Sequence, residues 1–321
     1  MTISILPRKR WLTILKESRV TWNRAKALVI GDVMLDKWTH HTKTRISPEA
    51  PVHVIKQTTT ESELGGAGNA LRHLNHLSGR SHELLTVVGN DLAGIELQEL
   101  CLHSRNKVHW IVDKSRKTTS KERFFIDKVL QFRKDTEDIA NISHAIEVEL
   151  IEILKKIISE FDVILLSDYA KGVLTENFVD QIKVLASSLE IPIVVDPGLG
   201  RLHVYYDCTI IKPNSIEWNQ HVSFVGSEEE ALRRIFNSRT EQVLVTQGSE
   251  GVRLITRSDD QSLKPNQKIE VVDVTGAGDS LAAGIVLLIG EGFSLKTSLE
   301  TLNEIGANTV RQIKTQLTGE K

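Results

Sequence analysis

Apolar and polar positions follow two periods that alternate along most of the chain. Short runs rich in β-branched residues, each closed by a polar residue or glycine, occur at "ALVIGD" (27–32), "LLTVVG" (84–89), "DVILLSD" (162–168), "IPIVVD" (191–196), "TIIKPN" (209–214) and "QVLVTQG" (242–248). Helical patterns occur at 8–24, 66–79, 93–104, 143–159, 175–188, 227–237, 279–290 and 296–313. This alternation predicts an α/β fold, with a mostly parallel sheet covered by helices on both faces.

The residues that follow the predicted strands are candidates for ligand binding. In open parallel sheets, ligands bind beyond the carboxyl ends of the strands. The candidates on this ground are Asp32, Gly89, Asp168, Asp196, Asn214 and Gly248.

Two segments interrupt the alternation. Residues 37–60 and 108–135 have the composition of strands but contain no helical pattern between them. We predict that they form a small antiparallel sheet beside the core, in the position of a lid. The chain has no internal repeat and no low-complexity linker, so we expect residues 1–321 to form a single domain with the lid segments inserted in it.

The bulk composition excludes several classes of function. The chain has 321 residues and a formal net charge of −2, so it has no overall basic field that would attract nucleic acid. Cys101 and Cys208 are far apart and form neither a disulfide framework nor a metal-binding spacing. The longest apolar run, 281–289, is far shorter than the roughly 20 residues that span a bilayer. The N-terminal apolar run is too short for a signal peptide, so we expect a cytoplasmic protein that binds neither nucleic acid nor membranes.

The stretch "VVDVTGAGDSLAAG" (271–284) is a candidate site for phosphoryl transfer. Small residues at 276–278 allow backbone N–H groups to approach an anion, and the helix that follows directs its positive dipole end at the same point. Asp279 lies in the first turn of this helix, where a carboxylate could accept a proton from a hydroxyl group. Helix capping is the alternative explanation for this aspartate.

Other polar and glycine-rich stretches are candidate binding sites, but each also has a purely structural explanation. "ELGGAGNALRHLNHLSG" (63–79) would let backbone approach a sugar or phosphate, but a tight turn with close helix packing also explains it. "KPNSIE" (211–217) places Asn214 and Glu217 three residues apart, which suits either magnesium-bound water or a helix cap. "TQGSEG" (246–251) alone would be a plain turn. The chain has neither the G-x-x-x-x-G-K-[ST] motif nor G-x-G-x-x-G, so a P-loop nucleotidase and a standard dinucleotide site are not expected.

The two glycine clusters, with N-x-x-E between them, resemble the ribokinase-like (PfkB) sugar kinases over almost the whole chain. "GDVMLDKW", "RISPEAPV", "LGGAGNA", "LSDYAKG" and "VTGAGD" are similar to the heptose 7-phosphate kinases of lipopolysaccharide precursor synthesis. The resemblance implies a ribokinase-like three-layer α/β/α sandwich with a small antiparallel β lid. It also implies phosphorylation of O1 of D-glycero-β-D-manno-heptose 7-phosphate with ATP and Mg²⁺, and it allows a monovalent cation. A nucleotidyltransferase is often fused to such kinases, and this chain resembles the stand-alone kinase.

The resemblance assigns a role to each matching residue. It makes Asp279 the catalytic base, with an anion hole formed by Gly276, Ala277 and Gly278. The implied sugar-phosphate-binding residues are Asp32, Gly65, Gly66, Asn69, Asp168 and Lys171, with Lys121, Arg123 and Arg133 of the lid at the 7-phosphate. The implied nucleotide-binding residues are Asn214, Glu217, Thr246, Gly248, Gly251 and Asn303. Asn214 and Glu217 would hold Mg²⁺ through water. Family members often dimerise through the lid, so a homodimer is expected.

One departure from the heptose kinases keeps two alternatives open. These kinases usually read "DPKG" where this chain has "DPGLG", so Gly198 stands in place of a lysine near the phosphates. The same chemistry on another sugar or sugar phosphate is therefore the first alternative. A sugar-phosphate-binding protein with weak catalysis is the second, and the presence of Asp279, Asn214 and Glu217 argues against it.

Overall fold

A nine-stranded sheet forms the centre of the molecule. The computed structural model describes residues 24–104, 106–264 and 276–318, without the side chains of 308 and 310–318. The helix predicted at 8–24 therefore lies outside the described residues. The strand order is β13-β12-β11-β10-β9-β8-β1-β4-β5. The strands are β1 (Ala27–Gly31), β4 (Glu83–Gly89), β5 (Lys107–Asp113), β8 (Val163–Ser167), β9 (Ile193–Asp196), β10 (Ile210–Ile211), β11 (Gln242–Thr246), β12 (Val252–Thr256) and β13 (Asp260–Leu263). In this order, the neighbouring strands β11, β10, β9, β8, β1, β4 and β5 pair in parallel. At one edge, β12 pairs antiparallel with both β11 and β13, so β12 alone runs in the opposite direction.

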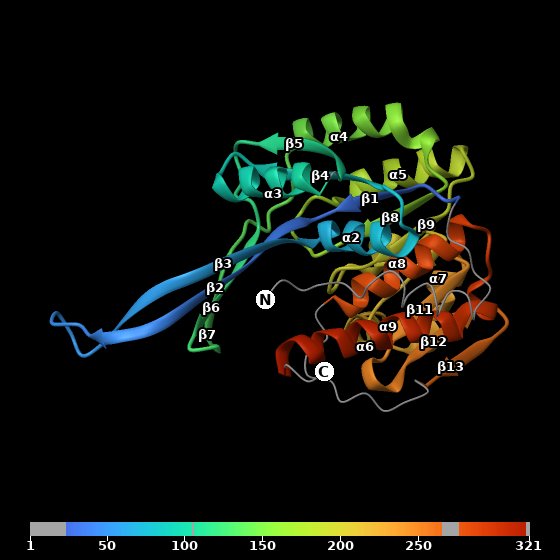
Figure 1. Ribbon diagram of the computed structural model, residues 1–321. Coiled ribbons are helices and arrows are strands. Elements are labelled where there is room, and N and C mark those ends of the chain that lie inside the picture. The colour runs from blue at the N-terminus through green and yellow to red at the C-terminus, as the bar shows by residue number, and fades with distance from the viewer. Residues whose placement is uncertain (1–23, 105, 265–275, 319–321) are drawn as a thin grey trace.

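Helices cover both faces of this sheet, which gives the predicted three layers (Figure 1). One layer consists of α2 (Ala67–Ser78), α3 (Leu92–His103), α8 (Ala277–Gly290) and α9 (Leu295–Thr318). The other consists of α4 (His144–Ile157), α5 (Glu176–Ser188), α6 (Ser215–Val225) and α7 (Glu228–Phe236). Short 3₁₀ turns are η1 (Ile158–Glu160), η2 (Leu202–Tyr205) and η3 (Gly248–Glu250). None of the described helices is long and apolar enough to cross a membrane.

Alternation along the buried strands divides the core in two. In β1, Ala27 and Val29 pack into the cluster that contains α2 and α8, whereas Leu28 and Ile30 pack into the cluster that contains α4 and α5. Successive side chains of a strand point to opposite faces, so a strand covered on both sides is apolar throughout. This explains why the six predicted strands read as continuous apolar runs, and each of them is confirmed within a few residues. Of the helices, α6 was not predicted, because its sequence follows "KPN" and was interpreted as a turn.

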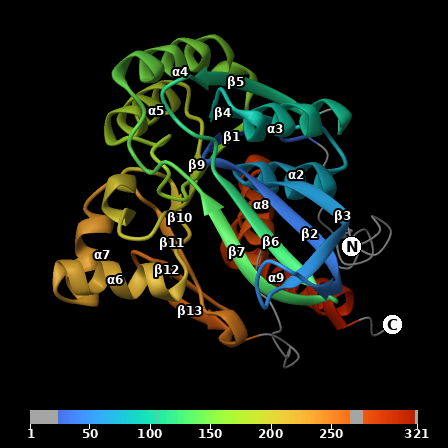
Figure 2. The same ribbon diagram turned by 90° about the vertical axis from the view of Figure 1, so that its left-hand side faces the viewer.

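A separate four-stranded sheet forms the lid, with the order β3-β2-β6-β7. Its strands are β2 (Val33–Ile46), β3 (His53–Gly66), β6 (Ser120–Ile126) and β7 (Val129–Thr136). The β2–β3 hairpin extends as a long arm away from the core (Figure 1), and Figure 2 shows the lid strands in front of the helices.

The lid differs from the predicted antiparallel sheet in two ways. β2 and β6 pair in parallel, because each leaves the core at the same end and runs outward in the same direction. The second predicted segment, 108–135, is divided, since β5 belongs to the large sheet, where β4 provides a parallel partner, and only β6 and β7 join the lid. The first segment is longer than predicted, because β2 starts directly after β1.

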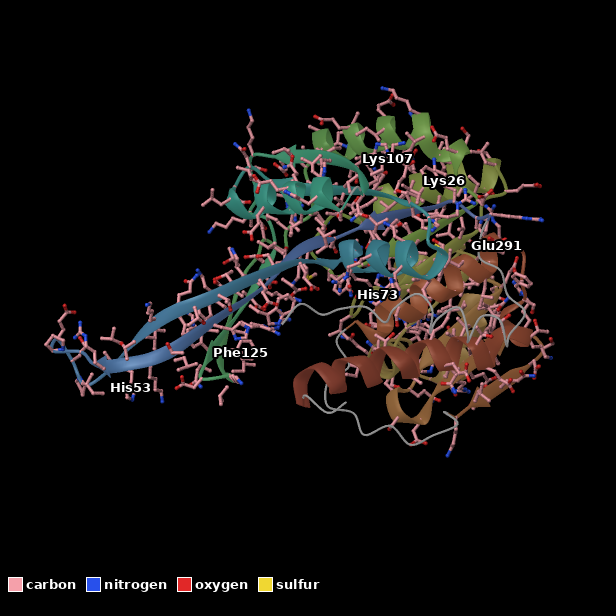
Figure 3. The ribbon with its side chains drawn as sticks, in the orientation of Figure 1. Lys26, His53, His73, Lys107, Phe125 and Glu291 are labelled. Carbon is pink, nitrogen blue, oxygen red and sulfur yellow. The ribbon has the colours of Figure 1, made fainter. Side chains whose placement is uncertain are left out.

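A cluster of charges lies at the amino ends of the central strands, away from the lid. The buried carboxylate of Glu83, at the start of β4, is 2.9 Å from the ammonium groups of Lys26 and Lys107 and 2.7 Å from His109 Nε2. Figure 3 labels the two lysines in this region. Burial alone would raise the pKa of Glu83, but hydrogen bonds from Lys26, His109 and Lys107 outweigh it and lower the pKa to about 2.

We expect Glu83→Gln to lower the free energy of unfolding at pH 7 by about 1.5–3 kcal/mol, the range for hydrogen bonds to charged groups. The folded-state pKa is depressed, so this stabilisation is present above the ordinary value of 4.5 and is lost as the pH falls toward about 2. Urea unfolding at pH 7 and pH 3.5 measures it. A gap between wild type and variant that stays constant between these pH values would contradict the assignment.

Candidate active site

Asp279 lies in the first turn of α8, directly after a left-handed glycine. Gly276 has φ +83° and precedes the helix, a conformation that favours glycine over any other residue. The first N–H groups of a helix have no intrahelical partner, and they lie at the positive end of the helix dipole. Asp279 itself is buried. The backbone of 276–278 therefore has the features of the predicted anion-binding turn, with a carboxylate beside it, and the binding of an anion there stays a prediction. Asp273 and Thr275, which precede it in the sequence, lie outside the described residues.

Two side chains from distant parts of the chain hold the Asp279 carboxylate. Asn69 Nδ2, in the first turn of α2, donates to Oδ2 at 2.5 Å, and the Tyr169 hydroxyl donates to Oδ1 at 2.5 Å. Arg72 Nη2 donates to Asn69 Oδ1 at 2.8 Å, which orients the amide with its N–H toward Asp279. These bonds connect α2, α8 and the loop after β8 at one point.

The glycines before α2 are explained by close packing around Asp32 and Asp36. A Cβ atom at Gly66, which has φ +59°, would lie 2.3 Å from the Asp32 carbonyl oxygen. A Cβ at Gly65 would lie 2.1 Å from Asp36 Oδ2. A side chain at Gly66 would displace the backbone before β2, and one at Gly65 would displace the Asp36 side chain, so the tight-turn alternative accounts for these two residues. Their predicted contact with a sugar stays a prediction.

Asp32 organises the loop that follows β8. Its carboxylate accepts hydrogen bonds from the backbone N–H groups of Tyr169 at 2.9 Å, Lys171 at 3.0 Å and Val173 at 3.1 Å. Asp32 is almost completely buried, so its charge depends on these three donors. The loop 168–173, which contains "DYAKG", is thus folded around the carboxylate of Asp32.

Asp168, the first residue of that loop, is already bound within the protein. Its Oδ2 accepts hydrogen bonds from Arg201 Nε at 2.6 Å and from the Tyr205 hydroxyl, and its Oδ1 accepts one from Ala170 N at 2.7 Å. Gly198 packs against the same carboxylate, since a Cβ there would lie 3.1 Å from Asp168 Cγ. Arg201, three residues beyond Gly198, thus places a cation on Asp168.

Lys212 places a buried cation beside the anion-binding turn. Only 2 % of this residue is exposed. Its Nζ lies 2.8 Å from Asp196 Oδ1 and 3.7 Å from the position that a Cβ would take at Gly278. A buried ammonium of this kind stabilises negative charge at the start of α8.

Asn214 and Glu217 form a capping box at the start of α6. Asn214 Oδ1 accepts from the N–H groups of Ile216 and Glu217, and the two Glu217 oxygens accept from Asn214 N and Nδ2, each at 2.7 Å. Direct ligation of a metal would compete with these bonds, whereas binding through water leaves them intact. In the described part of the chain, no three His, Cys, Asp or Glu side chains are grouped as a direct metal cage.

The remaining predicted nucleotide residues lie beyond β11 and on α9. Thr246 forms an isolated parallel bridge with Asn214, which places it beside the capping box. Gly248 and Gly251 have φ +57° and +92° and enclose η3, and a Cβ at Gly251 would lie 2.0 Å from the Leu263 carbonyl oxygen. Asn303 donates to the Lys264 carbonyl oxygen at 2.9 Å.

The predicted phosphate-binding cations of the lid share one face of the lid sheet. The register pairs Lys121 with Asp36, and Arg123 with both Trp38 and Arg133, and directly paired residues project on the same side. Arg123 Nη1 lies 2.7 Å from Asp36 Oδ1, and its guanidinium stacks over the Trp38 ring at 5.1 Å.

Other predicted cations are also paired with carboxylates. Arg133 Nε lies 2.8 Å from Asp135 Oδ1, and Lys171 Nζ lies 2.7 Å from Glu137 Oε2. A phosphate group bound by these cations would therefore have to compete with carboxylates for them.

Burial controls the ionisation of the acids in the site. It raises the pKa of Asp279 to about 6, against the effect of hydrogen bonds from Tyr169 and Asn69. It also raises the pKa of Asp32 to about 6, together with the nearby charge of Asp168. Burial and the charge of Asp196 raise the pKa of Glu217 to about 7. A carboxyl group with a pKa near 6 is ionised at neutral pH and is basic enough to accept a proton.

Three residues of the site have no role in the sequence-based prediction. Tyr169 and Arg201 reach acids that lie more than 30 residues away, so sequence spacing gives no signal for them. Lys212 lies inside the apolar run "TIIKPN". A charged residue in a buried strand needs a buried partner, so its position in this run is the sequence signal for a site residue. Its partner, Asp196, was a candidate only as the residue that closes a strand.

Residues 24–321 match the description "pfkB family carbohydrate kinase". The chain belongs to the pfkB family of carbohydrate kinases. It is 36 % identical over 297 residues to the "Bifunctional protein HldE" of Campylobacter jejuni subsp. jejuni, covering 90 % of this chain and 62 % of the relative. It is 34 % identical over 301 residues to the protein of the same name from Bradyrhizobium diazoefficiens, covering 90 % and 60 %. The chain thus spans about three fifths of the length of these curated relatives.

Solved structures show the same fold at low sequence identity. The "putative phosphofructokinase" of Staphylococcus aureus superposes with a TM-score of 0.71 at 17 % identity, covering 88 % of this chain and 91 % of that one. A ribokinase of Arabidopsis thaliana, solved with ribose and ATP, superposes with a TM-score of 0.63 at 17 % identity, covering 89 % and 93 %. The predicted ribokinase-like α/β class is therefore confirmed. Kinases of the pfkB family use ATP.

We expect Asp279→Asn to lower kcat by about 10²–10⁴-fold, the usual contribution of a general base, and to leave ATP affinity within about threefold. Because burial raises the pKa of Asp279 to about 6, wild-type kcat should rise with pH through about 6 as the carboxyl ionises. Steady-state ADP release between pH 5 and 8.5 measures both effects. A variant that turns over at the wild-type rate would remove Asp279 as the base.

Proposed function

We propose that the protein phosphorylates O1 of D-glycero-β-D-manno-heptose 7-phosphate with ATP, giving the 1,7-bisphosphate used in the synthesis of lipopolysaccharide precursors. The observation that carries this proposal is the "LSDYAKG" loop, one of the motifs similar to heptose 7-phosphate kinases. It folds around Asp32 and brings Tyr169 onto the predicted base, Asp279. The HldE relatives, about 35 % identical over nine tenths of this chain, support the same choice of sugar.

The geometry supports in-line transfer with Asp279 as the base. The acceptor hydroxyl gives its proton to the Asp279 carboxylate while its oxygen forms a bond to the γ-phosphorus of ATP. The bond between that phosphorus and the bridging oxygen breaks, and the electron pair leaves with ADP. The N–H groups at the start of α8 and the ammonium of Lys212 face the charge on the transferring group.

We propose that Mg²⁺ accompanies the nucleotide and is held through water by Asn214 and Glu217. The oxygen-rich pair suits a hard cation that keeps much of its water shell. The metal would neutralise charge on the phosphates of ATP. The protein's part is to hold Glu217 in a fixed position, which the capping box achieves.

A second candidate is the same reaction on another phosphorylated or free sugar. Gly198 stands where the heptose kinases usually have a lysine, and a Cβ there would lie 3.1 Å from Asp168 Cγ, so a side chain would require its neighbours to shift slightly. The cation beside Asp168 in this chain is Arg201, whose Nε lies 2.6 Å from Asp168 Oδ2. A catalytically weak binding protein is a third candidate, but the two donors that hold Asp279 argue against it.

The choice of sugar is tested with a panel of free sugars and sugar 5-, 6- and 7-phosphates, scored by ADP release with Mg·ATP. We expect D-glycero-β-D-manno-heptose 7-phosphate to have a kcat/KM at least tenfold above any other member. A higher value for another sugar would establish the second candidate. ATP-dependent turnover of none of them would support the third.

We expect Arg123→Ala to raise KM for the phosphorylated sugar about tenfold or more and to leave KM for ATP within about twofold, because a lost charge-assisted contact to phosphate weakens binding. Arg257→Ala is the matched control, since Arg257 also stacks on an aromatic ring, that of Phe236 at 5.8 Å, but on a different part of the chain. An equal rise in both KM values would exclude Arg123 from the phosphate site.

We propose that two copies associate through the lid. Apolar side chains are exposed on β7, where Phe132 is 55 % exposed and Val129 is 61 % exposed. We expect a dimer at micromolar concentration in sedimentation velocity, and Phe132→Glu should convert it to a monomer, since a charge would be buried in the contact. Phe224→Glu, at an exposed site on α6, is the control. Monomeric wild-type protein would contradict this proposal.

A further inference from the structure

Tyr169 connects two carboxylates of the site. Its hydroxyl donates to Asp279 Oδ1 at 2.5 Å, while its own backbone N–H donates to Asp32 Oδ2 at 2.9 Å. The residue thus lies between the acid predicted to bind the sugar and the acid predicted to act as the base. The proposed mechanism needs the carboxylate of Asp279 but gives Tyr169 no role.

We propose that Tyr169 is a positioning residue, whose hydroxyl holds the Asp279 carboxylate in its working orientation and keeps it ionised, and whose backbone ties that orientation to Asp32. The proposal rests on the proposed function only in taking Asp279 as the base, and it holds for any sugar that the site accepts. Tyr169 transfers no proton itself.

The two donors on Asp279 leave room for the reaction. A carboxylate has about four lone-pair sites on its two oxygens. Asn69 occupies one site on Oδ2 and Tyr169 one site on Oδ1, so each oxygen keeps a lone pair for the proton of the acceptor hydroxyl. One donor on each oxygen fixes the plane of the group, whereas a single donor would allow it to rotate about its Cβ–Cγ bond.

The groups that face Asp279 make the phenol important for its charge. Asp196 at the end of β9 opposes ionisation, whereas Lys212 after β10 and Asn69 on α2 favour it. His73, labelled in Figure 3, is on the same helix as Asn69. It lies beside Gly276 and is neutral, because burial lowers its pKa to about 3. Burial and the charge of Asp279 raise the pKa of the Tyr169 hydroxyl well above 10, so it remains a donor throughout the working range.

A purely structural role predicts a different result. If Tyr169 only filled space, Tyr169→Phe would keep the ring and lower activity equally at all pH values, or not at all. If the hydroxyl stabilises the ionised base, its loss raises the pKa of Asp279, and the acid limb of kcat moves to higher pH. A shift of about one pH unit, the effect of one lost hydrogen bond to a charge, is a tenfold change in the protonation equilibrium.

The first experiment measures kcat between pH 5 and 9 for wild type, Tyr169→Phe and Tyr206→Phe. Tyr206 is the matched control, since its hydroxyl pairs with His221 at 2.9 Å, away from the site. For Tyr169→Phe we expect kcat to fall about tenfold at pH 5.5, to recover to within twofold of wild type at pH 8.5, and KM for ATP to stay unchanged. Tyr206→Phe should follow wild type. Coincident acid limbs, or the same loss at every pH, would overturn the proposal.

The second experiment needs no turnover, so it separates this proposal from the proposed function. The Asp279 carboxyl carbon is assigned in protein labelled with [4-¹³C]aspartate by its absence in Asp279→Asn, and it is titrated by NMR. We expect the midpoint of Asp279 to rise in Tyr169→Phe and to fall when Tyr169 is replaced by 3,5-difluorotyrosine, a stronger donor. An unchanged titration midpoint of Asp279 in both Tyr169 variants would overturn the proposal, even if the sugar panel succeeds. The expected order of the midpoints would support the proposal, even if the sugar panel fails.

Discussion

The carboxylate of Asp32 is the contact on which the rest of the site depends. It is buried at the junction between the large sheet and the lid, and three backbone N–H groups of the loop 168–173 surround it. An unpaired charge at this depth would be strongly unfavourable, so the loop and the acid stabilise each other. From this point the loop carries Tyr169 to the start of α8 and Asp168 toward Arg201. One buried acid thus determines the positions of groups on both sides of the sheet's carboxyl edge.

Among the described residues, three acids around this edge each have a donor or cation beside them. Asp279 has two neutral donors, Asp168 has an arginine and a phenol, and Asp196 has Lys212. Neutral donors leave a carboxylate more basic than a direct ion pair would. Asp279 and Asp32 accept from neutral donors, whereas Asp168 and Asp196 are each paired with a cation.

Sequence patterns predicted the sheet, its helices other than α6, and the position of Asp279 in the first turn of α8, because local periodicity and one short loop determine these features. The runs from "ALVIGD" to "QVLVTQG" predicted the strands, and "VTGAGD" predicted the start of α8. The parallel pairing of β2 with β6 and the contacts of Tyr169 and Arg201 could not be predicted in this way. They join residues separated by 33 to 110 positions, and only the folded chain determines which of many polar groups meet.

The continuity of β1, Asp32 and β2 has a mechanical consequence. The arm formed by β2 and β3 has no flexible linker at its base, since Val33 pairs with Gly66, and Ala67 N donates to the Asp32 carbonyl at 3.0 Å. The base of the arm is therefore hydrogen-bonded to the backbone on both sides of the Asp32 side chain. The residue that organises the loop 168–173 is thus also the residue that joins the arm to the large sheet.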